Sequence, residues 1–269
     1  MKGSVHVVCV GIIVNMTKDI KLEITSKIIN WLEQRNCEVL LTEIVSQQLN
    51  KPDSGYAPLD IYKKADFVIV LGGDGTLLGA ARQCLWLETP ILGVNMGNLG
   101  FITEAEVKDV YTCLDNILRG DYSIESRMML EASVIKDDKQ IETFYCLNDI
   151  GLTKGTLSRI INLKTYIDDN YFDRYFADGL LISTPTGSTA YSLSAGGPIV
   201  SPNVNVILIT PICPHSLNSR TLIVSESDVI TVEVDDGYQE VYLTVDGQQG
   251  FKLMSGDKVV IKKLHSVPN

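Results

Sequence analysis

Three glycines surround one aspartate at Gly72–Thr76, and this short stretch offers the first chemistry in the sequence. It follows an apolar run, Ala65–Val70, that predicts a buried strand, and it precedes strong helix formers over Leu77–Cys84. The glycines therefore lie at a strand-to-helix turn, where the backbone can adopt unusual angles and approach a ligand closely. Because a helix N-terminus favours an anion, the expected ligand is a phosphate.

Asp74, in the middle of this turn, has two interpretations. A carboxylate repels phosphates unless a cation intervenes or the carboxylate has a task of its own. One such task is to accept a proton from a hydroxyl that attacks a phosphoryl group. In the structural interpretation, Asp74 is the N-cap of the following helix and the glycines serve only the turn. The turn alone favours neither interpretation, whereas three glycines around one aspartate favour the functional one.

The composition excludes several classes of protein. With 269 residues, 45% of them hydrophobic and 21% charged, the chain can form one large or two modest globular domains. A net charge of −10 argues against nucleic acid or an anionic membrane surface as the main partner. The six cysteines are scattered without a CxxC pair, which favours reduced thiols in the cytoplasm. Only three histidines occur, far apart, so no protein metal site is predicted.

The first half of the chain alternates predicted strands with predicted helices. Strands are expected at 6–14, 39–41, 65–70 and 90–95, and helices at 20–33, 77–84 and 107–118. Residues 46–64 are polar and contain two prolines, so we expect a mobile connection there. The alternation predicts an α/β domain with a Rossmann-like parallel sheet covered on both faces. Ligands of such sheets bind at the carboxyl ends of strands, where the glycine loop and Asn95–Gly100 fall.

From about Tyr122 the pattern changes to short strand-like runs. They lie at 128–135, 144–152, 160–167, 180–183, 204–210, 222–224, 229–234 and 241–245. Alternating apolar residues up to Val234 followed by Asp235-Asp236-Gly237 predict a hairpin. The second half is therefore expected to be a largely antiparallel β-rich domain. The predicted domains are 1–125, 126–252 and a C-terminal segment, 253–269, that could return to the first domain.

A second unusual stretch, Phe176–Pro198, lies inside the β-rich half. A strand ends there in a turn of proline, glycine, serine and threonine, and a helix of small residues begins. In the structural interpretation, Ser188 or Thr189 caps that helix. In the functional interpretation, hydroxyl and N–H groups at this helix start bind a nucleotide, and Tyr191 offers its ring face to a base. Asp178 with the glycine after it is by itself an ordinary turn.

Four blocks of the sequence closely resemble the NAD kinase family. They are Gly72–Thr76, Asn95–Phe101, Leu147–Asp149 and Asp178–Pro198, with support from Thr210–Leu217 and Val245–Gln248. Together the blocks span most of the chain. The glycine loop is shared with lipid kinases and phosphofructokinases, whereas Thr184–Pro198 is highly specific.

The resemblance implies transfer of the γ-phosphoryl group of ATP to the 2′-hydroxyl of the adenosine ribose of NAD, which gives NADP. It implies that Asp74 is the catalytic residue that accepts the proton of this hydroxyl. Mg²⁺ or another divalent cation would bridge the ATP phosphates rather than occupy a cage of protein ligands. Subunits of the family associate and complete one another's dinucleotide site, so a homodimer or homotetramer is expected.

The resemblance also implies a set of binding residues within or near these blocks. The residues implied for the phosphates are Gly72, Gly73, Gly75 and Thr76. Those implied for the dinucleotide are Phe101 as a wall, Asn148 and Asp149 for ribose hydroxyls, Asp178 toward the nicotinamide, and Thr189, Ala190, Tyr191 and Ser194 for the adenosine. Arg159, as a positive charge, and Gln248 complete the set. A lone arginine is more often a solvated surface residue, and without the resemblance a polar loop would be the favoured interpretation of Asn148-Asp149.

Two other functions and one departure from the family remain open at this point. A lipid kinase would share the glycine loop but expose an apolar or basic membrane-docking surface, which the sequence does not show. A nucleotide sensor that holds NADP without turnover would lack Asp74 or the glycine loop. Phe176 stands where some relatives carry a basic residue. The sequence does not decide between ATP and polyphosphate, whether NADH is accepted, or whether NADP or NADPH gives feedback.

Overall fold

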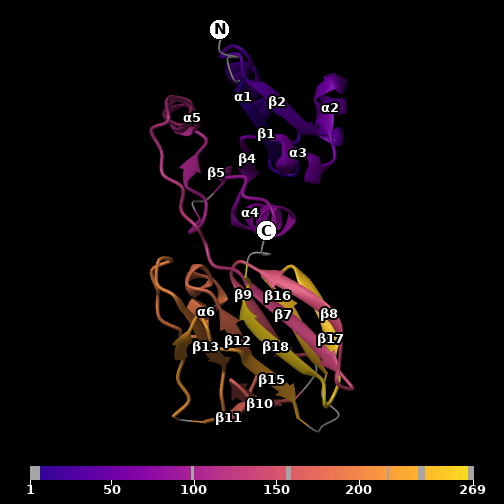
Figure 1. The fold of residues 1–269 in the computed structure, drawn as a ribbon, viewed down its shortest axis with the longest axis vertical. Coiled ribbons are helices and arrows are strands. Elements are labelled where there is room, and N and C mark those ends of the chain that lie inside the picture. The colour runs from indigo at the N-terminus through magenta and orange to yellow at the C-terminus, as the bar shows by residue number, and fades with distance from the viewer. Residues whose placement is uncertain (1–6, 98–99, 156–158, 217, 236–239, 266–269) are drawn as a thin grey trace, which may run out of the picture. The chain divides into compact units, whose positions relative to one another are not determined.

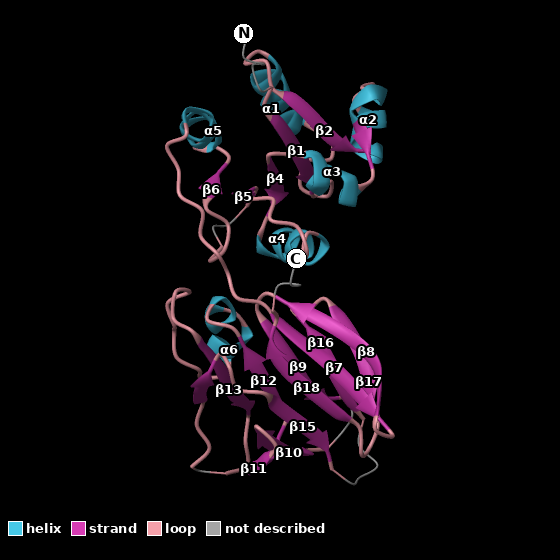
Figure 2. Ribbon diagram, viewed as in Figure 1, coloured by secondary structure: helices cyan, strands magenta, loops and turns pink. Residues whose placement is uncertain are grey.

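The computed structural model describes residues 7–97, 100–155, 159–216, 218–235 and 240–265 of the chain (Figure 1). The chain forms two compact units, Met1–Glu125 and Ser126–Asn269. Helices flank the strands of the first unit, whereas strands dominate the second (Figure 2). Among the described residues, no helix is long and apolar enough to cross a membrane.

The first unit is built on one parallel sheet of six strands in the order β3-β2-β1-β4-β5-β6. The strands are β1 (Cys9–Val14), β2 (Glu38–Thr42), β3 (Gly55–Tyr56), β4 (Phe67–Gly72), β5 (Ile91–Asn95) and β6 (Ala105–Glu106). The helices are α1 (Glu23–Glu33), α2 (Glu43–Gln48), α3 (Pro58–Lys64), α4 (Asp74–Gln83), α5 (Val110–Arg119) and the short 3₁₀ helix η1 (Pro52–Ser54).

Alternate side chains of β4 enter two different hydrophobic clusters. Ile69 packs in a cluster with residues of α1 and α5. Val68 and Val70 pack in another with residues of α3 and α4. Side chains of one strand point alternately to opposite faces of its sheet, so helices cover both faces. This confirms the predicted α/β architecture.

The expected mobile connection over residues 46–64 is wrong. The structure has α2, η1, β3 and α3 in this part of the chain. Pro52 and Pro58 do not break these helices but begin them, and the first helical position is where a missing N–H costs least. Ile61 and Tyr62 of α3 are fully buried against the sheet, which holds this helix in place.

The second unit contains two antiparallel sheets of six strands each, in the orders β11-β10-β15-β18-β7-β8 and β14-β13-β12-β9-β16-β17. The first contains β7 (Leu130–Lys136), β8 (Lys139–Cys146), β10 (Ile161–Ile167), β11 (Asn170–Ala177), β15 (Ile230–Val234) and β18 (Lys258–Lys263). The second contains β9 (Asp149–Lys154), β12 (Gly179–Ser183), β13 (Val206–Ile212), β14 (Leu222–Ser225), β16 (Val241–Val245) and β17 (Gln249–Leu253). Inner side chains of both sheets share one core, so the predicted antiparallel β domain is confirmed as a sandwich.

Two predicted connections in this unit are wrong. The hairpin expected at Asp235-Asp236-Gly237 does not form, because β15 and β16 belong to different sheets; Asp236 and Gly237 themselves lie outside the described residues. The single run expected over 144–152 is two strands, β8 and β9, which also lie in different sheets. In both cases the next strand belongs to the other sheet of the sandwich. Which sheet a strand joins depends on how its side chains pack in the core, and the residues of the preceding turn do not determine it.

Two edge strands, β11 and β17, escaped the sequence analysis. Six of the eight residues of β11 are exposed, and β17 buries only Leu253. An edge strand that buries so little lacks the apolar alternation by which a strand is recognised. Within the C-terminal segment, β18 pairs with β15 and β7 in the middle of a sheet, and its Val259 and Ile261 are buried in the sandwich core.

Candidate active site

The glycine loop follows β4, whose six residues are all buried, and leads directly into α4. Gly73 precedes the helix in an extended conformation, with φ −163°, and neither Gly72 nor Gly73 has a positive φ. The expectation of unusual backbone angles is therefore wrong. Close packing favours glycine at position 72, where a Cβ atom would lie 2.3 Å from Thr76 Oγ1. At Gly73 a Cβ atom would lie 2.8 Å from Nζ of the flexible Lys18 side chain, which would have to move aside.

Asp74 is the first residue of α4, and Gly73 rather than Asp74 occupies the N-cap position of this helix. Its carboxylate instead binds the segment after β5. Oδ2 accepts a hydrogen bond from Phe101 N (2.9 Å), and Oδ1 accepts from Thr103 N (3.2 Å) and Thr103 Oγ1 (3.1 Å). Gly100 must be glycine here, because a Cβ atom would lie 2.1 Å from Asp74 Oδ1. A carboxylate has about four acceptor positions, so three donors fix Asp74 and leave one position for a ligand.

Amide side chains at the ends of β1 and β5, the two strands that flank β4, support the glycine loop. Asn95, the last residue of β5, donates through Nδ2 to Thr103 Oγ1 (3.1 Å). Asn15, directly after β1, donates through Nδ2 to Thr76 Oγ1 (3.2 Å). The sequence analysis did not assign Asn15 or Thr103. Asn15 could have been found, because it follows the first predicted strand and the carboxyl ends of parallel strands meet at one edge.

In the second unit, the buried Asp246 carboxylate holds the loop between β8 and β9. Oδ1 accepts from Asn148 N (2.8 Å) and Asp149 N (3.3 Å), and Oδ2 accepts from Leu147 N (3.3 Å). In return, Asp246 N donates to Asp149 O (2.9 Å). The sequence analysis placed Asp246 in a supporting block without giving it a role, and the structure shows it as the anchor of this loop.

Asn148 and Asp149 are buried, with exposed fractions of 7% and 5%, so they do not form a solvated polar loop. Asn148 Oδ1 has no hydrogen-bond partner among the described residues. Ser183, which pairs with Asp149 across β9 and β12, also has a buried hydroxyl without a partner in the described part of the chain. Buried polar atoms in native proteins are nearly always hydrogen-bonded, so each of these two can accept a partner such as an ordered water or a polar ligand.

Burial, together with the nearby negative charge of Asp246, raises the pKa of the Asp149 carboxyl from 3.8 to about 7. Between about pH 4 and 7 the Asp149 carboxyl is therefore protonated in the folded protein but ionised in the unfolded chain. We expect the free energy of unfolding to decrease as pH rises through this range. Urea unfolding at several pH values should show this decrease in the parent protein and a smaller one in Asp149→Asn. Equal slopes in both proteins would contradict the assignment.

The turn that follows β12 is hydrogen-bonded to the loop between β8 and β9. Thr184 Oγ1 donates to Leu147 O (2.6 Å) and accepts from Gly187 N (3.0 Å), and Thr184 N donates to Asn148 O (2.9 Å). Gly187 lies so close that a Cβ atom would be 2.0 Å from Asn148 O. The specific Thr184–Pro198 block and the Leu147–Asp149 block therefore form one contact surface.

Two short helices follow this turn, η2 (Thr186–Thr189) and α6 (Tyr191–Ser194). No side chain caps either of them. The Ser188 hydroxyl instead binds the backbone of Val200, donating to O (3.2 Å) and accepting from N (3.0 Å). Thr189 Oγ1 donates to Thr186 O (3.2 Å). The capping interpretation of Ser188 and Thr189 is therefore wrong.

The structure places the remaining predicted residues as follows. Thr189 and Ala190 are half-buried beside the exposed Tyr191 and Ser194. Asp178 forms an ion pair with Lys154 (Oδ1 to Nζ, 2.7 Å), a partner that the sequence did not suggest. Gly75, Phe101, Arg159 and Gln248 are exposed, and Gln248 lies in the turn after Asp246.

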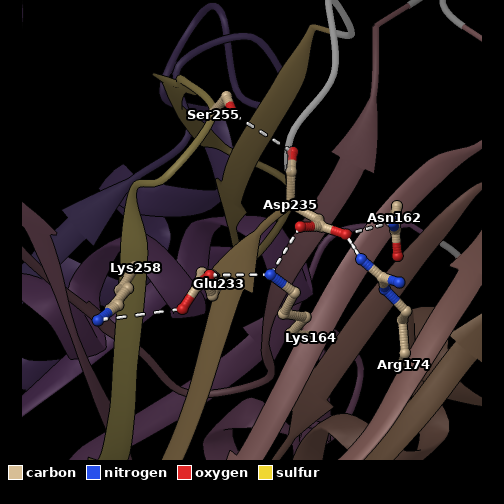
Figure 3. Close-up of polar contacts among 7 residues, drawn as sticks. All are labelled: Asn162, Lys164, Arg174, Glu233, Asp235, Ser255 and Lys258. Carbon is tan, nitrogen blue, oxygen red and sulfur yellow. Dashed lines mark hydrogen bonds and ion pairs between the residues drawn. The ribbon is translucent and has the colours of Figure 1, made fainter.

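A charged cluster around Asp235 lies on the sheet that contains β10 and β15 (Figure 3), near Phe176, which pairs with Asn162 across β10 and β11. The Asp235 carboxylate binds Lys164 (2.7 Å), Arg174 and Asn162 (2.6 Å). The Arg174 guanidinium lies 5.8 Å from the centre of the Phe176 ring. Arg174 thus brings a positive charge near the position where some relatives carry a basic residue, although Asp235 already binds it.

Comparison with known proteins gives the same family for both units. A model of the ATP-NAD kinase N-terminal domain matches residues 10–122, and one of the ATP-NAD kinase C-terminal domain matches residues 147–267. The chain is 51% identical over 260 residues to the NAD kinase of Thermoanaerobacter sp. (strain X514), covering 97% of this chain and 92% of that protein. It is 48% identical to the NAD kinase of Moorella thermoacetica, covering 94% and 81%.

Solved structures give the same result. Yeast NADH kinase complexed with NADH superposes with a TM-score of 0.86 at 31% identity, covering 96% of this chain and 81% of the yeast chain. An NAD kinase from Archaeoglobus fulgidus in complex with ATP has a TM-score of 0.71 at 23% identity, covering 96% and 91%, and supports the fold alone.

These similarities define the chain first as a kinase with two structural units and a glycine loop at a strand end. It belongs to the NAD kinase family, as the sequence analysis predicted, and it phosphorylates NAD to NADP. The lipid-kinase alternative is therefore excluded.

Proposed function

We propose that ATP with a divalent cation donates the phosphoryl group and that Asp74 accepts the proton of the attacking 2′-hydroxyl of NAD. The observation that carries this proposal is the fixed Asp74 carboxylate, which has one acceptor position left beside a glycine loop. A hydroxyl placed there would donate its hydrogen bond to the base that deprotonates it. The match to the ATP-NAD kinase family models supports ATP as the donor, and the NADH bound to the yeast enzyme supports a dinucleotide as the acceptor.

The second unit supplies the dinucleotide contacts in this proposal. Asn148 Oδ1 and the Ser183 hydroxyl are buried without partners in the described part of the chain, so each can bind a ribose hydroxyl at little additional desolvation cost. The Asp149 carboxyl can bind a second hydroxyl. Tyr191 is 47% exposed and can stack its ring on the adenine. Thr189, Ala190 and Ser194 would line the same position, and Asp178 would reach the nicotinamide end.

The residues present fit a divalent cation that the substrate brings with it. Within the described residues, no group of three or more histidine, cysteine or acidic side chains could hold a metal ion by itself. Mg²⁺ demands near-ideal octahedral geometry and keeps several waters, so substrate phosphates rather than a cage of protein ligands commonly hold it. Bound in this way, the cation would neutralise charge on the phosphates. Gly72, Gly73, Gly75 and Thr76 would position them.

We further propose a reducing compartment, the cytoplasm, and a homodimer or homotetramer. All six cysteines are free in the structure. Burial raises the pKa of the Cys9 and Cys84 thiols to about 11, which keeps them protonated and unreactive. The exposed Phe176, Tyr191 and Ile199 of the second unit could pack against another subunit. Light scattering after size-exclusion chromatography would measure the oligomer directly.

The experiment that tests the function incubates purified protein with ATP, Mg²⁺ and NAD and measures NADP with an NADP-specific dehydrogenase. We expect NADP only when all three are present. Product with polyphosphate but not with ATP would contradict the proposed donor. No product with either donor, despite tight NAD binding, would contradict phosphoryl transfer itself. A parallel reaction with NADH measures acceptance of the reduced dinucleotide.

A further inference from the structure

A cavity of about 230 Å³ lies in the first unit where β5 ends. Its polar lining comes from Lys18, Asn95, Glu106 and Lys108, and the backbone of Gly97 completes it. Pockets that enclose a whole drug-sized ligand usually measure about 300–1,000 Å³. The cavity is therefore suited to part of a ligand, such as a phosphate group, rather than to a complete nucleotide.

The charges around this cavity leave one ammonium group without a counter-ion. Lys108 pairs with Glu106 (Nζ to Oε2, 2.7 Å), so these two charges compensate each other. Lys18 forms no ion pair within the described part of the chain, and its Nζ donates to the Gly72 carbonyl oxygen (3.3 Å). Its neighbour Asp19 is buried and accepts hydrogen bonds from Thr25 N (2.9 Å) and Oγ1 (2.7 Å) instead. The Lys18 charge is thus available to an anion.

The backbone around Lys18 holds its ammonium group over the glycine loop. Asn15 Oδ1 accepts from Thr17 N (3.1 Å) and Oγ1 (2.7 Å), and Lys18 N donates to Asn15 O (3.0 Å), which makes a compact turn after β1. A Cβ atom on Gly73 would lie 2.8 Å from Lys18 Nζ, and one on Gly97 would lie 3.4 Å from it. The ammonium group therefore lies next to the loops that follow β4 and β5.

The topology makes this the expected place for a ligand. From β1 the sheet continues through β2 to β3, and from β4 it continues in the opposite direction through β5 to β6. Ligands of open α/β sheets bind at the carboxyl ends of the strands where the order reverses, here between β1 and β4. Lys18 follows β1 and the glycine loop follows β4.

We propose that Lys18 binds the terminal phosphate groups of the donor and positions the transferable phosphoryl group. Lysine is a compact, strongly hydrated point charge that suits phosphate. In a chain of net charge −10, with Asp74 on the same loop, such a cation offsets repulsion between protein and donor. This inference rests on the proposed ATP-dependent function, which it deepens by naming a residue of the donor site.

Lys18→Met tests the inference. We expect kcat/KM for ATP to decrease about 10- to 100-fold, the effect of losing one charge-assisted hydrogen bond, whereas the affinity for NAD remains unchanged. Calorimetric titration with ATP in the absence of NAD should show a comparable loss of affinity. Lys18→Arg should retain most of the binding. Lys18→Gln can still donate to the Gly72 carbonyl oxygen but has no charge, so it should lose ATP affinity as Lys18→Met does.

Lys21→Met is the matched control, because it removes an exposed lysine from the same segment between β1 and α1. It should leave kcat/KM for ATP unchanged. If Lys18→Gln binds ATP as tightly as the parent protein, Lys18 acts only through its hydrogen bond to the Gly72 carbonyl oxygen, and the inference is overturned. An active parent protein with an equally active Lys18→Met variant would overturn it as well. A parent protein that makes no NADP from ATP would instead overturn the proposed donor.

Discussion

Asp74→Asn lowers kcat for NADP formation by about 100-fold or more while the affinity for NAD stays within a few-fold of the parent value. A positioned general base typically contributes about 10²- to 10⁴-fold to a rate, and an amide cannot accept the hydroxyl proton. Part of the loss has a second cause in the structure. Three donors point at the carboxylate, and an asparagine NH₂ group would face at least one of them. Steady-state kinetics and NAD titration measure the two quantities separately.

Thr103→Val separates these causes. It removes the hydroxyl that donates to Asp74 Oδ1 but leaves the carboxylate and the two backbone donors in place. If Asp74 is the base, kcat should decrease far less in Thr103→Val than in Asp74→Asn. Comparable losses in the two variants would mean that Asp74 mainly holds the Phe101–Thr103 segment. Near-parental turnover in Asp74→Asn would remove Asp74 from the base role.

Gly187→Ala raises KM for NAD about 10-fold or more and lowers the free energy of unfolding by about 1–3 kcal/mol. The added Cβ atom would lie 2.0 Å from Asn148 O, and backbone atoms rather than a flexible side chain would have to move. The residues displaced are those that connect the Thr184 turn to Asn148 and Asp149. Chemical unfolding and NAD titration measure the two effects.

Gly79→Ala is the matched control for this substitution. Gly79 lies inside α4 and has no positive φ, and apart from its neighbours in the chain and the backbone of its own helix nothing lies within 4 Å of a Cβ atom placed there. Alanine in a helix interior is favoured over glycine by about 1 kcal/mol, so this variant should be at least as stable as the parent. An unchanged KM for NAD in Gly187→Ala would show that Asn148 does not need its observed position to bind the dinucleotide.

The sequence alone determined the features that depend on neighbouring residues. The buried β4, the turn of glycines and α4 follow from an apolar run, small residues and helix formers in direct succession. The change from alternating strands and helices to short strands predicted both architectures. The motif around Thr184 and the loop at Asn148 predicted the family, because each is a run of consecutive residues that can be recognised without knowledge of the fold.

Only the tertiary structure decided which distant groups meet. Asp246 binds Leu147, which is 99 residues away in the sequence, and Asp74 binds Thr103 across 29 residues. No local pattern encodes such pairs, because the geometry that joins them comes from sheet order and packing. For the same reason the sequence did not show that the Asp74 carboxylate binds Phe101 and Thr103 instead of capping its own helix. Nor did it show Lys18 above Gly73, since that position requires β1 and β4 to be neighbours in the sheet.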